Sequence, residues 1–189
     1  MIADEIVVVS GLPRSGTSMM MSMLSAGGIA PLKDELRQAD EDNPRGYWED
    51  DRVKRLRDDS SWMGEARGKV LKVVSALLPY LPSQFQYRVI FMERALPEIL
   101  ASQNKMLERS GRQPAATDDK MTVFYSQHLD KIRGWLATQA NVTTQFLSFS
   151  EVVRDPRQAA DDVATFLTQP LDIAQMVSVV DAALYRKRA

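Results

Sequence analysis

Side chains able to bind an anion are most concentrated at residues 11–18. They read Gly-Leu-Pro-Arg-Ser-Gly-Thr-Ser, so two glycines, one cation and three hydroxyls lie within eight residues. The β-branched run 6–9 precedes this segment and a helix-favouring run follows from Thr17. Backbone N–H groups and the positive end of a helix converge at such a strand-loop-helix junction. The segment therefore predicts a phosphate-binding loop; the alternative is an ordinary tight turn.

The residue at position 17 limits which phosphate ligands the loop is expected to bind. The spacing of residues 11–18 follows the nucleoside-triphosphate loop G-x-x-x-x-G-K-[ST], whose lysine neutralises the β- and γ-phosphates. Thr17 stands at the lysine position, and the nearest cation in the loop is Arg14. We therefore predict a phosphate geometry different from that of ATP and GTP enzymes.

Residues 13–18 resemble the 5′-phosphosulfate loop of sulfotransferases that use 3′-phosphoadenylyl sulfate (PAPS). That family also places an arginine at the end of a core strand and a serine eight residues later, and the two hold the 3′-phosphate of the donor. Arg94 and Ser102 reproduce this spacing. Weaker similarities at residues 43–49 and 146–156 extend the resemblance over about residues 5–170. It implies an enzyme that transfers a sulfuryl group from PAPS to a hydroxyl or amine.

The resemblance implies a role for particular residues. Those expected to bind PAPS, or its product adenosine 3′,5′-bisphosphate (PAP), are Arg14, Ser15, Gly16, Thr17, Ser18, Arg94 and Ser102. Arg186 and Arg188 are expected either to add charge at the 3′-phosphate or to form a solvated helix end. Arg14 is also placed with the catalytic residues, because it is expected at the 5′-phosphosulfate.

Lys72 and Glu49 are the other two predicted catalytic residues. The cytosolic branch of the family carries Lys-Thr-His on its second strand, where this chain has Lys72, Val73 and Val74. Lys72 is expected to reach the transferring group. Since the histidine is missing, Glu49 is the candidate base, and a surface carboxylate is the alternative. The single histidine, His128, is expected to be a surface or packing residue, with the base as the alternative. Tyr47, Trp48 and Trp62 either line an acceptor pocket or pack in the core or an interface.

The order of predicted elements indicates an α/β fold. Strands alternate with helices, which favours a three-layer sandwich around a parallel sheet of four to five strands, of the P-loop nucleotide-binding type. The predicted strands are 5–10, 69–74, 87–92 and 142–149. The predicted helices begin at 17, 51, 75, 97, 118, 156 and 172, and the last is expected to reach about residue 187. The resemblance over residues 146–156 implies a strand, an acidic-hydrophobic turn and a helix that starts at Asp155-Pro156.

Composition limits the classes of function. The chain has 189 residues with 44% hydrophobic content, so we expect one domain over residues 1–189. It contains no cysteine and one histidine, so no metal site is expected. The net charge of -1 disfavours nucleic-acid binding, and no apolar stretch is long enough for a membrane span. We expect a cytoplasmic protein with a small-molecule or glycan acceptor; its oligomeric state is not predicted.

Two other functions remain open from the sequence. A small-molecule kinase of the P-loop type would explain the loop, but it conflicts with Thr17 and with strand 87–92 ending in Glu93-Arg94. A non-catalytic nucleotide-binding module would explain the missing histidine. Relative affinity for PAP and for ATP with magnesium separates these alternatives.

Overall fold

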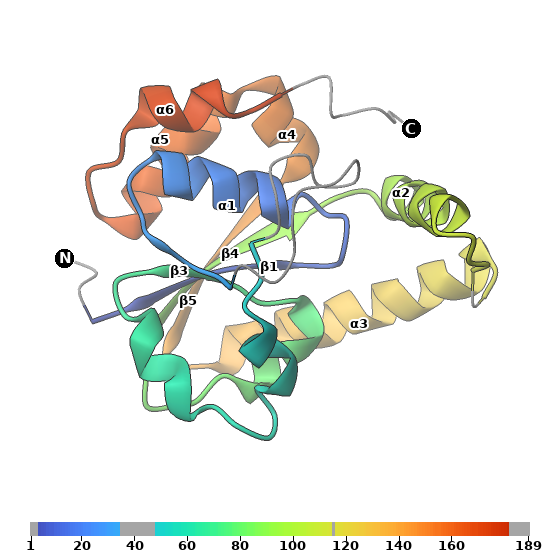
Figure 1. Ribbon diagram of the computed structural model, residues 1–189, viewed down its shortest axis with the longest axis horizontal. Coiled ribbons are helices and arrows are strands. Elements are labelled where there is room, and N and C mark those ends of the chain that lie inside the picture. The colour runs from blue at the N-terminus through green and yellow to red at the C-terminus, as the bar shows by residue number, and fades with distance from the viewer. Residues whose placement is uncertain (1–3, 35–47, 115, 182–189) are drawn as a thin grey trace.

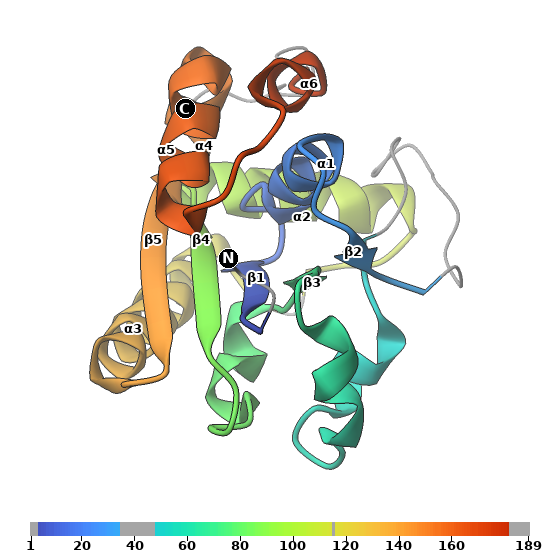
Figure 2. The same ribbon diagram turned by 90° about the vertical axis from the view of Figure 1, so that its left-hand side faces the viewer.

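The computed structural model describes residues 4–34, 48–114 and 116–181, and its five strands form one parallel sheet (Figure 1). The order across the sheet is β2-β3-β1-β4-β5, which Figure 2 shows from right to left. The bounds are β1 Ile6–Gly11, β2 Pro31–Leu32, β3 Val70–Lys72, β4 Tyr87–Glu93 and β5 Val142–Ser148. In register, Val9 pairs with Lys72, and Gly11 pairs with Met92. The carboxyl ends of β3, β1 and β4 therefore meet at one edge.

Helices cover both faces of this sheet. Figure 1 shows α1 (Thr17–Ala26), α4 (Phe149–Arg154), α5 (Pro156–Leu167) and α6 (Ile173–Ser178) above it. Below it lie α3 (Asp118–Thr138) and three 3-10 helices, η1 (Asp51–Arg55), η2 (Ser61–Ala66) and η3 (Ser75–Tyr80). The helix α2 (Leu96–Arg109) follows β4 and packs on α3. The predicted three-layer α/β fold is confirmed.

Alternate residues of β1 enter two different hydrophobic cores. Val7 and Val9 pack with α1, α5 and α6 in the α1-side core. Ile6 and Val8 pack with residues of α3 and the 3-10 helices in the α3-side core. Because both faces are covered, the whole strand is buried. This explains why its sequence is continuously apolar rather than alternating.

Several elements of the structure differ from the prediction. The sequence reading missed β2, because two residues beginning with a proline show no periodicity. The turn expected after β5 is instead the helix α4. Among the described residues the last helix ends at Ser178, and Val179 and Val180, which follow it, pack against the α1-side core. Residues 182–187 of the predicted helix lie outside the described residues.

Candidate active site

The loop after β1 begins with a tight turn. The amide of Ser15 donates to the carbonyl of Leu12 at 3.1 Å, and Pro13 and Arg14 are the central residues. Arg14 has φ 72°, in the left-handed region that normally favours glycine. Proline followed by a residue of positive φ is the pattern of a type II turn. Of the loop amides predicted to bind the phosphosulfate, that of Ser15 is thus already used within the turn.

The start of α1 forms the second half of the loop. Gly16 is the N-cap residue, with φ 99° and no side-chain hydrogen bond to the helix. The N-terminal amides of α1 are therefore not capped by that residue, as expected where an anion binds. The Ser15 hydroxyl, 1% exposed, has no hydrogen-bond partner among the described residues. A buried orphan hydroxyl beside an uncapped helix end fits a phosphate ligand.

An arginine cluster, consisting of Arg14, Arg94, Glu98 and Ser102, lies on the β4-α2 side of the loop. Arg14 Nε donates to Ser102 Oγ at 3.0 Å, and Arg94 Nη1 donates to the Arg14 carbonyl at 3.1 Å. Arg94 Nε also donates to the Glu98 carboxylate at 2.8 Å. Glu98 and Ser102 are four residues apart and so share one face of α2. The structure therefore links Arg94 and Ser102 through Arg14, which contacts both of them.

Phe149, the first residue of α4, holds this cluster against the loop. The Arg94 guanidinium lies 4.5 Å from the centroid of the Phe149 ring, within the range of a cation-π contact. On the loop side, a Cβ atom at Gly16 would lie 2.3 Å from Phe149 Cδ2. Glycine at this position therefore permits the close contact between loop and ring.

A lysine cluster, consisting of Lys72, Ser18 and Glu49, lies on the β3 side of the loop. Lys72 Nζ is 3.2 Å from Ser18 Oγ and 3.2 Å from Glu49 Oε1. The Lys72 side chain is 11% exposed and that of Glu49 is 32% exposed. Two predicted catalytic residues, 23 positions apart in the sequence, are thus in direct contact.

The backbone around Glu49 is fixed by its neighbours. The Glu49 carbonyl accepts a hydrogen bond from the amide of Asp34, and the Asp50 side chain caps η1 through the amide of Arg52. The Arg52 guanidinium also contacts the Asp50 carboxylate. This contact holds the pKa of the buried Asp50 carboxyl below its usual value. Glu49 therefore projects from an anchored segment next to η1.

Other predicted residues are not brought into these clusters. Arg186, Arg188 and Tyr47 lie outside the described residues. Trp62 is 7% exposed and belongs to the α3-side core, so it does not line an open pocket. His128 Nε2 lies 2.8 Å from Ser75 Oγ, which links α3 to η3.

Sequence reasoning missed two residues of the site. Glu98 follows Arg94 by four positions, and this helical spacing of opposite charges was a usable signal. Phe149 gave no signal, because its contact with the loop depends on the packing of α4.

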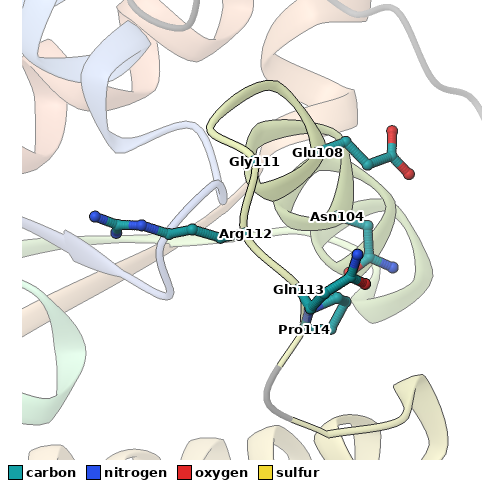
Figure 3. Close-up of a pocket in the computed structure, with 6 residues that line it drawn as sticks. All are labelled: Asn104, Glu108, Gly111, Arg112, Gln113 and Pro114. Carbon is teal, nitrogen blue, oxygen red and sulfur yellow. The ribbon is translucent and has the colours of Figure 1, made fainter.

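A separate hollow of about 400 Å³ lies at the C-terminal end of α2. Figure 3 shows Asn104, Glu108 and the loop that follows, with Arg112 pointing away from the other lining residues. None of the predicted site residues lines it. Within the described part of the chain, no group of three or more His, Cys, Asp or Glu residues is arranged to hold a metal. The described helices also include none with the length and apolarity needed to cross a bilayer.

A comparison with models of known families shows which family this chain belongs to. The family model described as "Sulfotransferase domain" matches residues 4–187. The chain belongs to the sulfotransferase domain family. The prediction of a sulfotransferase-type enzyme is therefore confirmed, and sulfuryl transfer is its general chemistry.

Solved structures agree in fold. A sulfotransferase domain from the curacin biosynthetic pathway has a TM-score of 0.59 and 13% identity, with 94% of this chain and 78% of that chain covered. The mouse sulfotransferase SULT7A1, complexed with PAP, has a TM-score of 0.54 and 13% identity, with 99% and 67% covered. Comparison with curated protein sequences gives no significant match.

Proposed function

We propose that this sulfotransferase uses PAPS as donor and transfers the sulfuryl group to a hydroxyl or amine of a small molecule or glycan. The proposal rests on the loop of residues 11–18, which ends at the N-terminus of α1, where the N-cap residue makes no side-chain hydrogen bond. The arginine cluster lies on one side of this loop and the lysine cluster on the other. A donor with phosphates at both the 5′ and 3′ positions needs two anion subsites. The mouse relative complexed with PAP supports this choice of donor.

The loop and its neighbours divide into two binding regions. The amides of Gly16 and Thr17 and the hydroxyls of Ser15, Thr17 and Ser18 would hold the 5′-phosphosulfate. Arg94 and Ser102 would hold the 3′-phosphate, because a guanidinium and a hydroxyl donate well to phosphate oxygens. Arg14, which contacts Ser102, would add its charge at the 5′-phosphosulfate.

Sulfuryl transfer requires an aligned acceptor, stabilisation of charge on the leaving phosphate and removal of the acceptor proton. PAPS supplies the activated sulfuryl group when bound. Lys72 would place its ammonium near the developing negative charge, beside Ser18 at the start of α1. Glu49 would accept the acceptor proton, and its contact with Lys72 keeps the carboxylate oriented at the same place.

Trp48, next to Glu49, supports an acceptor site on this side of the loop. Its ring packs partly against the α1-side core and lies 5.2 Å from Lys33 Nζ. Aromatic walls with a few polar groups are common in small-molecule sites. The acceptor would therefore approach over Trp48 and Glu49, on the side of the lysine cluster.

Calorimetric titration with PAP and with ATP plus magnesium tests the donor. We expect tight binding of PAP and weak binding of ATP, since the loop has threonine in place of the lysine that neutralises β- and γ-phosphates. Equal affinity, or a preference for magnesium-ATP, would favour a kinase and contradict the proposal. Tight PAP binding without transfer to any acceptor in a screen with labelled PAPS would instead indicate a non-catalytic binding module.

A further inference from the structure

The exposed side of α3 carries a pair of large apolar side chains. Of the large hydrophobic residues that are exposed in the described part of the chain, Val123 and Phe124 are the two most exposed, at 57% and 60%. The opposite side of α3 is buried through Tyr125, Ile132 and Leu136. In both Figure 1 and Figure 2, α3 lies at the outside of the layer below the sheet. Val123 and Phe124 therefore face away from the body of the molecule.

Charged residues of opposite sign flank this pair in a repeated pattern. The dipeptide Asp-Lys occurs at residues 119–120 and again at residues 130–131, and all of these residues are exposed. A separation of eleven residues is about three turns of an α-helix, so the second dipeptide lies above the first on the same side of α3. The aspartates thus form an acidic edge, and the lysines, about 100° further around the axis, form a basic edge. We define the α3 face as Asp119, Lys120, Val123, Phe124, Asp130 and Lys131.

The α3 face has little contact with the rest of the described chain. Among the described residues, its one ion pair joins Asp130 to Arg133 of the same helix. The Phe124 ring contacts that of Tyr125, its neighbour in the sequence. One turn beyond Lys131, a Cβ atom at the exposed Gly134 would meet no described atom within 4 Å. The face is therefore open along its length.

We propose that the α3 face is an interface between two copies of this chain, which pair through parallel α3 helices related by a two-fold axis. In a parallel pair this axis runs along the helices, so the acidic edge of each copy meets the basic edge of the other. In an antiparallel pair the axis runs across the helices and each edge meets its own copy, which opposes like charges. The repeated Asp-Lys dipeptide therefore selects the parallel pair.

The composition of the α3 face favours a second copy over another kind of occupant. The face carries as many acidic as basic residues, so it has no net charge with which to attract an anionic lipid surface or a nucleic acid. An identical face supplies the complement of both edges at both dipeptides. Phe124, beside the basic edge, would cross toward Val123 of the second copy, and both side chains would leave water.

Sedimentation equilibrium of the full chain between about 1 and 200 μM, the range suited to a small and weak interface, measures the association. The average mass should rise from one chain toward two. Phe124→Ser should weaken dimerisation by about 10-fold or more. Tyr80→Ser, at a 41% exposed aromatic residue of η3, is the matched control and should leave dimerisation unchanged. A wild-type chain that stays monomeric, or a Phe124→Ser variant that dimerises as well as the wild type, would overturn the proposal.

Charge reversal distinguishes the parallel from the antiparallel pair. Lys120→Asp/Lys131→Asp makes both edges acidic and should weaken dimerisation by about 10-fold or more. The further changes Asp119→Lys and Asp130→Lys exchange the two edges and should restore the affinity to within about threefold of the wild type, which would also exclude misfolding as the cause of the loss. An antiparallel pair opposes like charges before and after the first change, so an unaltered affinity of that variant would contradict the parallel arrangement.

A cross-link tests which residues meet. The chain contains no cysteine, so Gln127→Cys, at an exposed position between the two edges, introduces a single thiol. In the parallel pair each residue between the edges lies near its own copy, so Gln127→Cys and Gly134→Cys should both form disulfide-linked dimers on mild oxidation. Arg157→Cys, at an exposed residue of α5, is the control for random collision. Cross-linking no faster than in this control would overturn the proposal. These measurements use no nucleotide, so their outcome is independent of the proposed donor.

Discussion

The arginine and lysine clusters border the same loop but are built differently. Arg94 is held by the Glu98 carboxylate, the Arg14 carbonyl and the face of Phe149. Lys72, in contrast, contacts the Ser18 hydroxyl and the Glu49 carboxylate through one ammonium nitrogen. A planar guanidinium with several fixed partners suits the static recognition of a phosphate, whereas an ammonium on a flexible stem suits charge that changes during a reaction.

This difference implies a division of function between the two sides of the loop. Changes in the arginine cluster should reduce donor affinity and leave the transfer step little affected. Changes in the lysine cluster should slow transfer and leave affinity for PAP nearly intact. Single substitutions in and next to each cluster test that division.

Glu49→Gln should slow sulfuryl transfer by about 10²- to 10⁴-fold, the usual contribution of a positioned base, because the amide cannot accept a proton. PAP affinity should change by less than about threefold. The measurement is the initial rate of transfer from labelled PAPS to an acceptor found by screening, together with calorimetric titration of PAP. Glu151→Gln, at a 65% exposed glutamate of α4, is the matched control. Unaltered turnover in Glu49→Gln would exclude Glu49 as the base.

Arg94→Ala should lose about 1.5–3 kcal/mol of PAP binding and almost none of AMP binding, since AMP lacks the 3′-phosphate that Arg94 would contact. Calorimetric titration of both nucleotides measures this. Since the change also deprives the buried Glu98 carboxylate of Arg94, the double variant Arg94→Ala/Glu98→Gln serves as a control for misfolding. Equal losses for PAP and AMP in both variants would place Arg94 outside the 3′-phosphate subsite.

Gly16→Ala should lower the free energy of unfolding by about 1–3 kcal/mol more than Gly28→Ala, as measured by urea denaturation. Both glycines have positive φ, 99° and 104°, so the backbone cost is similar. A Cβ at Gly16 would lie 2.3 Å from Phe149, whereas one at Gly28 meets nothing within 4 Å. Displacing Phe149 should also weaken PAP binding, because that ring supports Arg94. Equal destabilisation by both changes would show that the loop does not depend on this contact.

Local patterns in the sequence predicted the parts of the site that depend on local structure. The buried run of β1, the turn at Pro13 and the start of α1 follow from consecutive residues. Arg94 and Ser102 were expected from a family resemblance, and they lie at one strand-helix junction. Lys72 and Glu49 were expected from a family resemblance, and their contact arises only when the anchored segment before η1 meets β3. Glu98 and Phe149 were missed because their roles depend on the packing of α2 and α4 against the loop.

Substitution of His128 is expected to change transfer least. It tests whether the catalytic base belongs to the lysine cluster. Burial, and secondarily the charge of Lys131, lowers the pKa of the His128 imidazole below its usual 6.5. The unfolded chain therefore binds this proton more readily, so stability should fall as the pH drops through about 6.5 toward the lower folded value. His128→Gln, which can keep a hydrogen bond to Ser75 Oγ, should remove that part of the pH dependence while leaving transfer within about twofold of wild type. Urea denaturation between about pH 5 and pH 8, with transfer rates at each pH, measures both. A large loss of turnover in this variant would assign the base to His128 instead of Glu49. It would also contradict the division between the clusters, which requires that the proton be accepted beside Lys72.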